Sequence, residues 1–395
     1  MPKYAKGDLL AAVAALTPAL RAASQESEAR RGLSEPLVQA LVEGGLYGML
    51  LPRSLGGGEV DPLTYFEIIE ALAEVESAAA WSVMISSAVM TTSVRWLPDE
   101  TLAAMFKSPR DTVMAGSAPP RGRLVPAPGG YLLTGRWAQG SNIAAARWVQ
   151  AGCLVADSGQ TQSGPAAKPP PVMCVFPAGA AAIIDTWHTT GMRGTGSHDF
   201  AVKDLFVPVE HVQVAPGGWL RSGPLYRVEG WSQVAGWSQL AHAAIGLGIA
   251  RDALEEFIKL AGSKQPTWQP MPGALATKGT VQAKVAQAEA LVGSGRAYVI
   301  EASRDMWETA LRPALPSAQQ RAVYRLAIAQ AMTNAVQAVD LLYSIAGVSA
   351  IYQESRLDRA LRDAHTAAAH VWVAPDTYEL SGRLLLGLDP GSPNI

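Results

Sequence analysis

The sequence is short of the residues that mark disulfide-rich, nucleic-acid-binding or membrane-spanning proteins. It has only two cysteines, Cys153 and Cys174, both inside apolar runs, which argues against a disulfide framework and a cysteine-rich metal site. Its 32 lysines and arginines are balanced by 34 acidic residues, so the composition predicts no broad positively charged surface that would bind nucleic acid or anionic lipid. No run reaches the ~18 uninterrupted apolar residues that span a bilayer. We therefore expect a cytoplasmic protein that binds no nucleic acid, no membrane and no metal.

The sequence does contain enough apolar side chains to build a large core. Hydrophobic residues make up 49% of the 395 positions, and a chain of this length is expected to form two or three structural units. Residues 1–111 repeat apolar side chains at helical spacing. Residues 112–230 change to short β-branched runs separated by Gly and Pro, typical of an antiparallel barrel or sandwich, and residues 231–395 return to long helical stretches. The pattern predicts an α+β protein with an N-terminal helical domain, a middle β domain and a C-terminal bundle of four long helices.

The segment Trp187–Asp199 is the richest candidate for a ligand site. Its glycines would let backbone amides approach a ligand closely, Thr195 and Ser197 offer hydroxyl groups, and Arg193 can neutralise a phosphate or a reduced isoalloxazine ring. A β-turn without any ligand explains the same composition, and the segment lacks the spacing of either common phosphate-binding loop. The residues alone leave both interpretations open.

Four segments, in the same order along the chain, resemble the acyl-CoA dehydrogenase superfamily. Residues 44–58 resemble its N-terminal helix-to-loop pattern, and residues 134–141 resemble its flavin-contacting strand. Residues 191–208 resemble the signature of its middle domain, and residues 246–251 resemble its first bundle helix. The resemblance covers nearly the whole chain. It implies a flavin cofactor and an acyl-CoA dehydrogenase-like fold, in which the middle domain is an antiparallel β-barrel and the C-terminal domain is a four-helix bundle.

The resemblance also locates the proton-abstracting carboxylate of a dehydrogenase, and this chain lacks it. Such an enzyme needs an Asp or Glu beside the flavin to remove the proton alpha to a thioester. Aligned on the run that starts at Arg362, the usual position of the base is Val371, and the alternative position lies near Ser238. Residues 231–248 contain no Asp or Glu. Both positions lack a carboxylate, which disfavours acyl-CoA dehydrogenation.

Histidines stand close to the first of these positions. His370 precedes Val371, and His365 lies five residues before His370. This pattern is similar to the group D flavin-dependent monooxygenases, in which reduced flavin from a separate reductase reacts with oxygen to give a C4a-hydroperoxide. The resemblance implies that His370 and His365 are catalytic, assisting proton transfer to the peroxide or deprotonating a phenolic substrate, because a histidine pKa of about 6.5 suits either role. A purely structural role is the alternative. A shared metal is disfavoured, because five residues rotate a helix by about 140°.

The resemblance assigns two groups of residues to the flavin, and the sequence suggests a third group for the substrate. The flavin edge would be contacted by Trp137, Gln139, Gly140 and Ser141, and its other wall would be formed by Met192, Arg193, Gly194, Thr195, Gly196 and Ser197. Trp137 is equally explained as a core residue of the barrel. Trp81 and Met84 are candidates for an apolar pocket wall that keeps water from a hydroperoxide, and core packing is the alternative for both.

We therefore expect a two-component flavin-dependent monooxygenase. It would use FMNH2 or FADH2, with O2 as co-substrate, to hydroxylate or oxygenate a small aromatic or heteroatom-bearing molecule. No Gly-x-Gly-x-x-Gly unit lies between a strand and a helix, so NAD(P)H is expected to serve a separate flavin reductase. The resemblance also implies a homotetramer. The alternatives are an FAD-dependent acyl-CoA dehydrogenase with another base, and a non-catalytic flavin- or ligand-binding member of the same fold.

Overall fold

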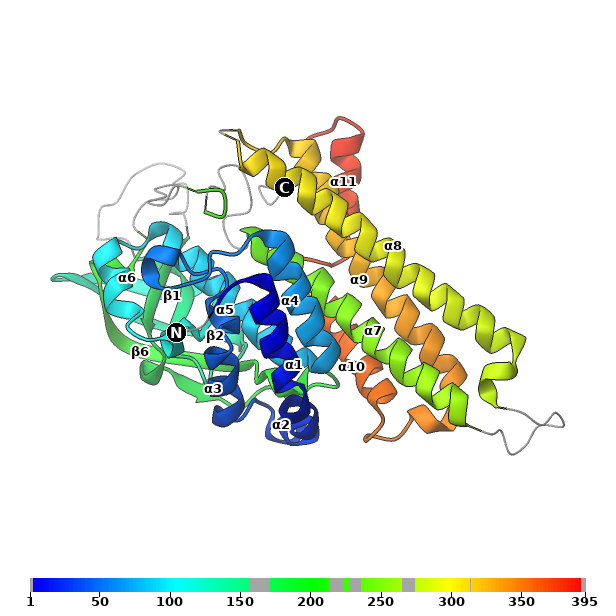
Figure 1. Ribbon diagram of the computed structural model, residues 1–395. Helices are drawn as coiled ribbons and strands as arrows, with labels where there is room; N and C mark the ends of the chain where they lie inside the picture. The colour runs from blue at the N-terminus through cyan, green and yellow to red at the C-terminus, as the bar shows by residue number, and fades with distance from the viewer. Residues whose placement is uncertain are drawn as a thin grey trace.

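The protein is built from helices, then a β-sheet, then more helices along the chain. The computed structural model describes residues 3–156, 171–213, 223–226, 236–264, 274–312 and 314–391. Its element order confirms the predicted α+β class and the order of the three parts. Figure 1 shows the sheet at one side, the long C-terminal helices at the other side, and the N-terminal helices between them. The predicted division between residues 111 and 112 lies just before the first strand, and the division between residues 230 and 231 lies outside the described residues.

The N-terminal unit is helical. Its helices are α1 (Lys6–Ala22), α2 (Ser24–Arg30), α3 (Glu35–Glu43), α4 (Pro62–Val75), α5 (Ser77–Trp96) and α6 (Asp99–Met105). The start of α4 is fixed by Asp61, whose carboxylate accepts hydrogen bonds from the backbone N–H groups of Leu63 and Thr64. By length and composition α5 could cross a membrane, but 83% of its most apolar window is buried inside the protein. An all-round apolar helix in such surroundings is a core helix.

The middle unit is a mixed sheet: among the described strands the expected antiparallel pairing is confirmed for four pairs of neighbours and is wrong for one. Its strands are β1 (Met114–Ala127), β2 (Gly130–Gly140), β3 (Trp148–Val155), β4 (Val172–Pro177), β5 (Ala182–Ile184) and β6 (His198–Pro208), in the order β4-β3-β1-β2-β6-β5. Neighbours pair antiparallel except β1 and β3, which run parallel. The physical reason is that the chain crosses over after β2 and returns to the far side of β1 in the same direction. Residues 141–147 form this crossover connection.

The C-terminal unit confirms the predicted bundle of four helices. It consists of α7 (Leu240–Ser263), α8 (Gly279–Ala310), α9 (Ala318–Ala346) and α10 (Arg356–Ala368), followed by the shorter α11 (Asp376–Leu385). In the bundle α9 packs against α7, α8 and α10, and α10 also packs against α7. Figure 1 shows α7, α8 and α9 running side by side.

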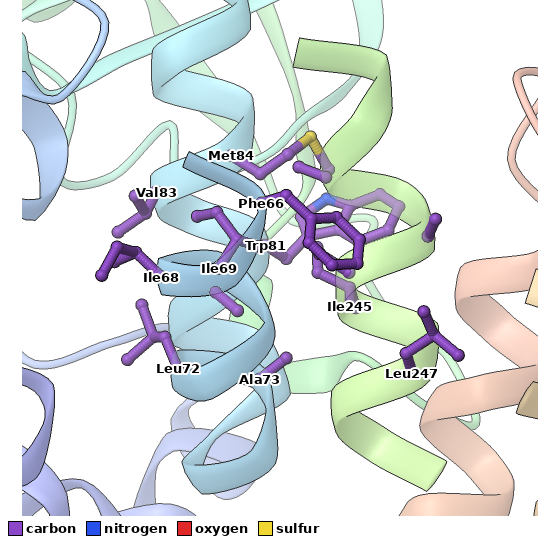
Figure 2. Packing of buried hydrophobic residues seen from close by; sticks show 14 of the residues in the cluster. Phe66, Ile68, Ile69, Leu72, Ala73, Trp81, Val83, Met84, Ile245 and Leu247 are labelled. Atoms are coloured by element: carbon purple, nitrogen blue, oxygen red, sulfur yellow. The ribbon is translucent and has the colours of Figure 1, made fainter. Parts of the chain in front are cut away.

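The main core lies where α4, α5 and α7 meet, and it connects the two helical units. Figure 2 shows Phe66 of α4, Trp81 of α5 and Ile245 of α7 packed together. Helix α7 approaches α4 closely because residue 248 is glycine: a Cβ added there would lie 2.5 Å from the carbonyl oxygen of Glu70. This contact brings the first turns of α7 next to α5.

Candidate functional site

Three rings from three helical segments meet at one point of this core. Trp81 comes from α5, His242 from the first turn of α7, and His370 from the residues that follow α10. The ring centroids of His242 and His370 are 4.3 Å apart with a tilt of 31°. Trp81 lies edge-on to each imidazole, at a centroid distance of 5.6 Å. His242 is buried and His370 is half-buried. The two imidazoles therefore form a close, tilted pair against one indole.

Hydrogen bonds indicate which ring nitrogens carry protons. The Nδ1 atom of His242 lies 3.0 Å from the carbonyl oxygen of Gln239, so Nδ1 carries the proton and Nε2 is an acceptor. The Nδ1 atom of His370 accepts a long, 3.4 Å hydrogen bond from the backbone N–H of Trp372, which leaves the proton on Nε2. Burial lowers the pKa of His370 to about 4, and burial together with His370 lowers the pKa of His242 well below its ordinary value. Both rings are therefore neutral at neutral pH.

A chain of hydroxyl groups joins Trp81 to the segment Trp187–Asp199, which we call the glycine-rich segment. The indole N–H of Trp81 donates to Oγ of Ser141 over 3.2 Å. Ser141 Oγ lies 2.7 Å from Ser197 Oγ, which lies 2.7 Å from Thr195 Oγ1. The Thr195 hydroxyl donates to the carbonyl oxygen of Met192 over 2.8 Å. Ser141 after β2 and the segment before β6, both predicted to contact flavin, are thus joined by hydrogen bonds next to Trp81, whose ring contacts both imidazoles.

Arg193 offers positive charge in the same segment. It is half-buried, and its Nε atom is buried without a hydrogen-bond partner among the residues that the structure describes. Buried donors of this kind are nearly always paired, and a guanidinium pairs most strongly with an anionic oxygen. Together with the hydroxyls of Ser141, Thr195 and Ser197, Arg193 fits an anionic group such as a reduced flavin ring or a phosphate.

The glycines of the segment contact protein, which differs from the expectation that they clear space for a ligand. A Cβ on Gly191 would lie 2.0 Å from the carbonyl oxygen of Arg362 in α10, and a Cβ on Gly194 would lie 2.9 Å from Cβ of Ala78 in α5. Gly196 has φ +52°, and a Cβ there would lie 2.7 Å from the carbonyl oxygen of Arg31. The absence of side chains therefore lets the segment pack against both helical units.

Replacing Gly191 by alanine is expected to lower the free energy of unfolding by about 1–3 kcal/mol, because overpacking against backbone atoms forces the chain apart. The matched control is Gly179→Ala, since a Cβ at Gly179 meets nothing within 4 Å. The control should stay within about 0.5 kcal/mol of wild type. Urea unfolding of the three proteins measures both values. Equal stability of the two variants would contradict the packing role of Gly191.

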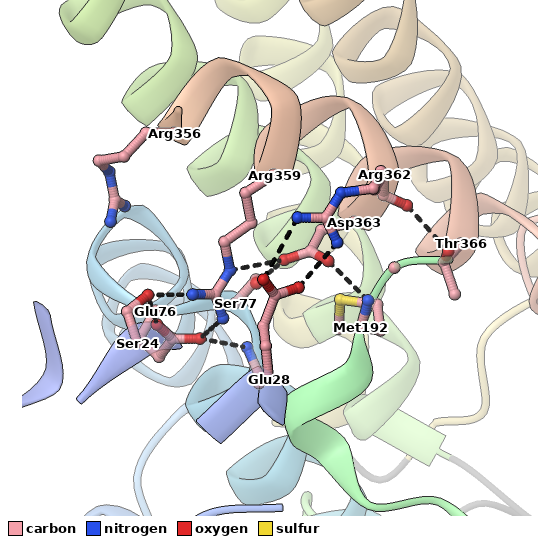
Figure 3. Close-up of polar contacts among 12 residues, drawn as sticks. Ser24, Glu28, Glu76, Ser77, Met192, Arg356, Arg359, Arg362, Asp363 and Thr366 are labelled. Carbon is pink, nitrogen blue, oxygen red and sulfur yellow. Dashed lines mark hydrogen bonds and ion pairs between the residues drawn. The ribbon is translucent and has the colours of Figure 1, made fainter. Parts of the chain in front are cut away.

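A buried ionic network holds α10 against the same segment (Figure 3). The Asp363 carboxylate accepts hydrogen bonds from the backbone N–H of Met192 and from the hydroxyl of Ser77, each over 2.5 Å. Arg359, one turn earlier on α10, forms ion pairs with Glu76 and Asp363. Because His370 follows α10 directly, this network positions His370 relative to the glycine-rich segment.

Several predicted residues lie in the core or at the surface. Trp137 is fully buried in the sheet, where its indole N–H donates to the carbonyl oxygen of Gly152 over 2.8 Å and its ring stacks on Phe200. This placement supports the core interpretation of Trp137. Met84 is also buried, and Figure 2 shows it among the core side chains. The side chain of His365 is 53% exposed, and its Nε2 lies 2.8 Å from a carboxylate oxygen of Asp340, so it is not part of the imidazole pair.

Two further predicted residues stand at the end of β2. Gln139 is exposed and has a left-handed backbone conformation, with φ 60°. Gly140 is buried, and a Cβ there would lie 2.7 Å from the ring of Phe200. Glycine at position 140 therefore lets the backbone pass close to Phe200, and the next residue, Ser141, forms the hydrogen bonds described above.

His242 is the site residue that the sequence reasoning missed. It is the only ionisable residue between residues 231 and 248, the stretch that contains no carboxylate. It also lies four residues after Ser238, which is one turn along a helix on the same face. A search of this stretch for any acid or base, rather than for Asp and Glu alone, finds it.

Comparison with known proteins identifies the fold family. The family model described as acyl-CoA dehydrogenase, N-terminal domain, matches residues 11–102, and the model described as acyl-CoA dehydrogenase, C-terminal domain, matches residues 240–375. Indole-3-acetate monooxygenase of Pseudomonas putida is 30% identical over 94% of this chain and 91% of that protein. The oxygenase component of the FADH(2)-dependent resorcinol hydroxylase of Rhizobium sp. (strain MTP-10005) is 26% identical over 97% of this chain and 95% of that protein.

Solved structures have the same fold over almost the whole chain. XiaF from Streptomyces sp., in complex with FADH2 and glycerol, matches with a TM-score of 0.89 and 24% identity, covering 99% of this chain and 98% of that one. TdsC from Paenibacillus sp. A11-2, with FMN and indole, matches with a TM-score of 0.78 and 20% identity, covering 98% of this chain and all of that one. The chain therefore belongs to the acyl-CoA dehydrogenase family and is an oxidoreductase of its flavin-dependent monooxygenase kind.

Proposed function

We propose that the protein transfers one oxygen atom from O2 to a small aromatic or heteroatom-bearing substrate, using FMNH2 or FADH2. One observation carries this proposal. The two helices that supply the base in a dehydrogenase, α7 and α10, here bring His242 and His370 together at 4.3 Å, and both imidazoles are neutral at neutral pH. A neutral imidazole of low pKa is a poor base for removing a proton alpha to a thioester, whereas its N–H is a good hydrogen-bond donor to oxygen.

The residues of the glycine-rich segment and the crossover connection would hold the flavin. Arg193 supplies positive charge, Ser141, Thr195 and Ser197 supply hydroxyls, and the other predicted contacts are Gln139, Gly140, Met192, Gly194 and Gly196. When bound, reduced flavin would supply the two electrons that activate O2. His370 would donate its Nε2 hydrogen bond to the reacting oxygen, and the buried rings around it would keep out water.

A separate NAD(P)H:flavin reductase would deliver the reduced flavin, in accordance with the word "component" in the name of the resorcinol hydroxylase relative. The protein would act in the cytoplasm as a homotetramer. Its substrate would be a small molecule, and the proposal covers FMNH2 and FADH2 alike.

Stopped-flow absorbance tests the proposal most directly. Protein and anaerobically reduced FMN or FAD are mixed with oxygenated buffer, and we expect a protein-dependent transient, distinct from oxidised flavin, that decays faster when substrate is added. The control is free reduced flavin without protein. Reoxidation at the rate of free flavin would refute the oxygenase proposal. Bleaching of bound FAD by an acyl-CoA would then favour the dehydrogenase alternative.

A further inference from the structure

His242 carries a buried hydrogen-bond acceptor that no residue in the described part of the chain uses. Only 3% of the residue is exposed, and its Nε2 atom has no partner there. Its Nδ1–H is bonded to the carbonyl oxygen of Gln239 in the preceding turn. Nε2 is the ring nitrogen farther from Cβ, so its lone pair points away from the backbone of His242 itself. Buried polar atoms are nearly always paired, and this atom therefore calls for a donor.

The neighbouring rings do not supply that donor. A hydrogen bond to an imidazole nitrogen lies near the plane of the ring. His370 lies over the face of the His242 ring instead, with centroids 4.3 Å apart. The indole N–H of Trp81 is already donated to Ser141. Among the residues that the structure describes, Nε2 is therefore left available to a molecule that enters the site.

His370 is held less firmly than His242. It is half-buried, and it lies between the end of α10 at Ala368 and the start of α11 at Asp376, outside regular helix. Its Nδ1 atom is held by a hydrogen bond of 3.4 Å, which is long and weak. Rotation of the His370 ring therefore costs little compared with movement of His242, which is anchored within α7.

We infer that His242 determines substrate specificity, because its Nε2 accepts a hydrogen bond from an O–H or N–H group on the aromatic substrate. The inference rests on the proposed function, since it concerns the substrate of the same site. The site would then favour phenols and indole-like heteroaromatics over molecules of the same shape without a donor. A site built to pair with a donor rejects the analogue that leaves its buried acceptor unpaired.

Two matched pairs of probes test this inference by equilibrium binding to the full chain. Indole and benzofuran differ by an N–H in place of an oxygen, and phenol and fluorobenzene differ by an O–H in place of fluorine. Binding is measured by calorimetry under nitrogen, with reduced flavin present. We expect wild type to bind the donor of at least one pair about ten-fold more tightly than its isostere. The pair that shows the preference identifies the donor as N–H or O–H.

Two variants separate hydrogen bonding from packing. His242→Phe keeps an aromatic ring but removes the acceptor, so it should bind the two members of each probe pair with nearly equal affinity. His242→Gln keeps an acceptor near the position of Nε2 and should retain most of the preference. A purely structural His242 would leave the preference unchanged in both variants, and that result would overturn the inference.

The wild-type comparison needs no variant, so the inference stays testable if His242→Phe does not fold. Equal affinity of wild type for both members of both pairs would refute it. Binding under nitrogen requires no oxygen transfer. A failed binding test is therefore distinct from a failed stopped-flow test of the proposed function.

Discussion

Replacing His370 by alanine is expected to lower the product formed per reduced flavin consumed by about 100-fold, within the range that a positioned proton donor contributes. The variant loses the Nε2–H that His370 presents, since its Nδ1 accepts the backbone N–H of Trp372. Flavin should still be oxidised, so the electrons that no longer reach substrate should appear as hydrogen peroxide. Product and peroxide are measured together by chromatography and a peroxidase assay.

His365→Ala is the matched control for this prediction. His365 lies on the same helix that leads to His370, but its side chain is 53% exposed and pairs with Asp340. Its removal should leave the ratio of product to peroxide within about two-fold of wild type, because an exposed pair of this kind contributes little. A large loss in His365→Ala, or a wild-type ratio in His370→Ala, would reverse the assignment of the two histidines.

The pH dependence follows from the surroundings of the His370 ring. Burial lowers its pKa to about 4, so the ring is neutral throughout the neutral range; protonation at lower pH would add a proton at Nδ1, which accepts the backbone N–H of Trp372. Titration of His370 should therefore change the product ratio only when the pH falls toward about 4. A step in the wild-type ratio near the ordinary histidine pKa of about 6.5, absent from His370→Ala, would show that the ring is better solvated than its surroundings indicate.

The order of the units could be predicted from sequence, but the pairing in the sheet could not. Helical periodicity and β-branched runs report local backbone preference, and the order of units that they predict is confirmed. The parallel pairing of β1 with β3 depends on where the chain goes after β2, which local patterns do not encode. The expected barrel is therefore antiparallel, whereas one pair of neighbouring strands in the sheet is parallel.

In the candidate site too, residues could be predicted where the local sequence identifies them, but not where their role depends on a contact with a distant part of the chain. His370 was found because its position next to Val371 could be compared with a known family. His242 escaped notice because its partner is 128 positions away in the chain, and only packing of α7 against α10 places the two rings 4.3 Å apart. For Trp137 the sequence left two interpretations open, since alternation along a strand does not show which face meets the core. The structure places it in the core.

Replacing Arg359 by methionine is expected to lower the free energy of unfolding by about 3–5 kcal/mol, the largest stability effect that we predict. Arg359 is the cation shared by Glu76 and Asp363, whose side chains are only 2% and 3% exposed. Without Arg359, the buried carboxylates of Glu76 and Asp363 lose this cation and keep only hydrogen bonds from hydroxyl and backbone N–H groups. The control is Arg304→Met, which removes an exposed pair with Glu301 and should cost less than about 1 kcal/mol.

The decrease in the free energy of unfolding caused by Arg359→Met should become smaller as the pH is lowered. In wild type, burial raises the pKa of Glu76 above its ordinary value of 4.5, and the Arg359 charge opposes that rise. Removing Arg359 raises the pKa of Glu76 further, so the folded variant binds a proton more tightly than the unfolded chain does. Stability from such a group is present at low pH and is lost as the pH rises through the raised pKa. Urea unfolding between about pH 5 and pH 8 should therefore show a smaller difference in the free energy of unfolding between variant and wild type at the acidic end. A gap independent of pH would mean that Arg359 acts through packing of its side chain rather than through the charge of Glu76.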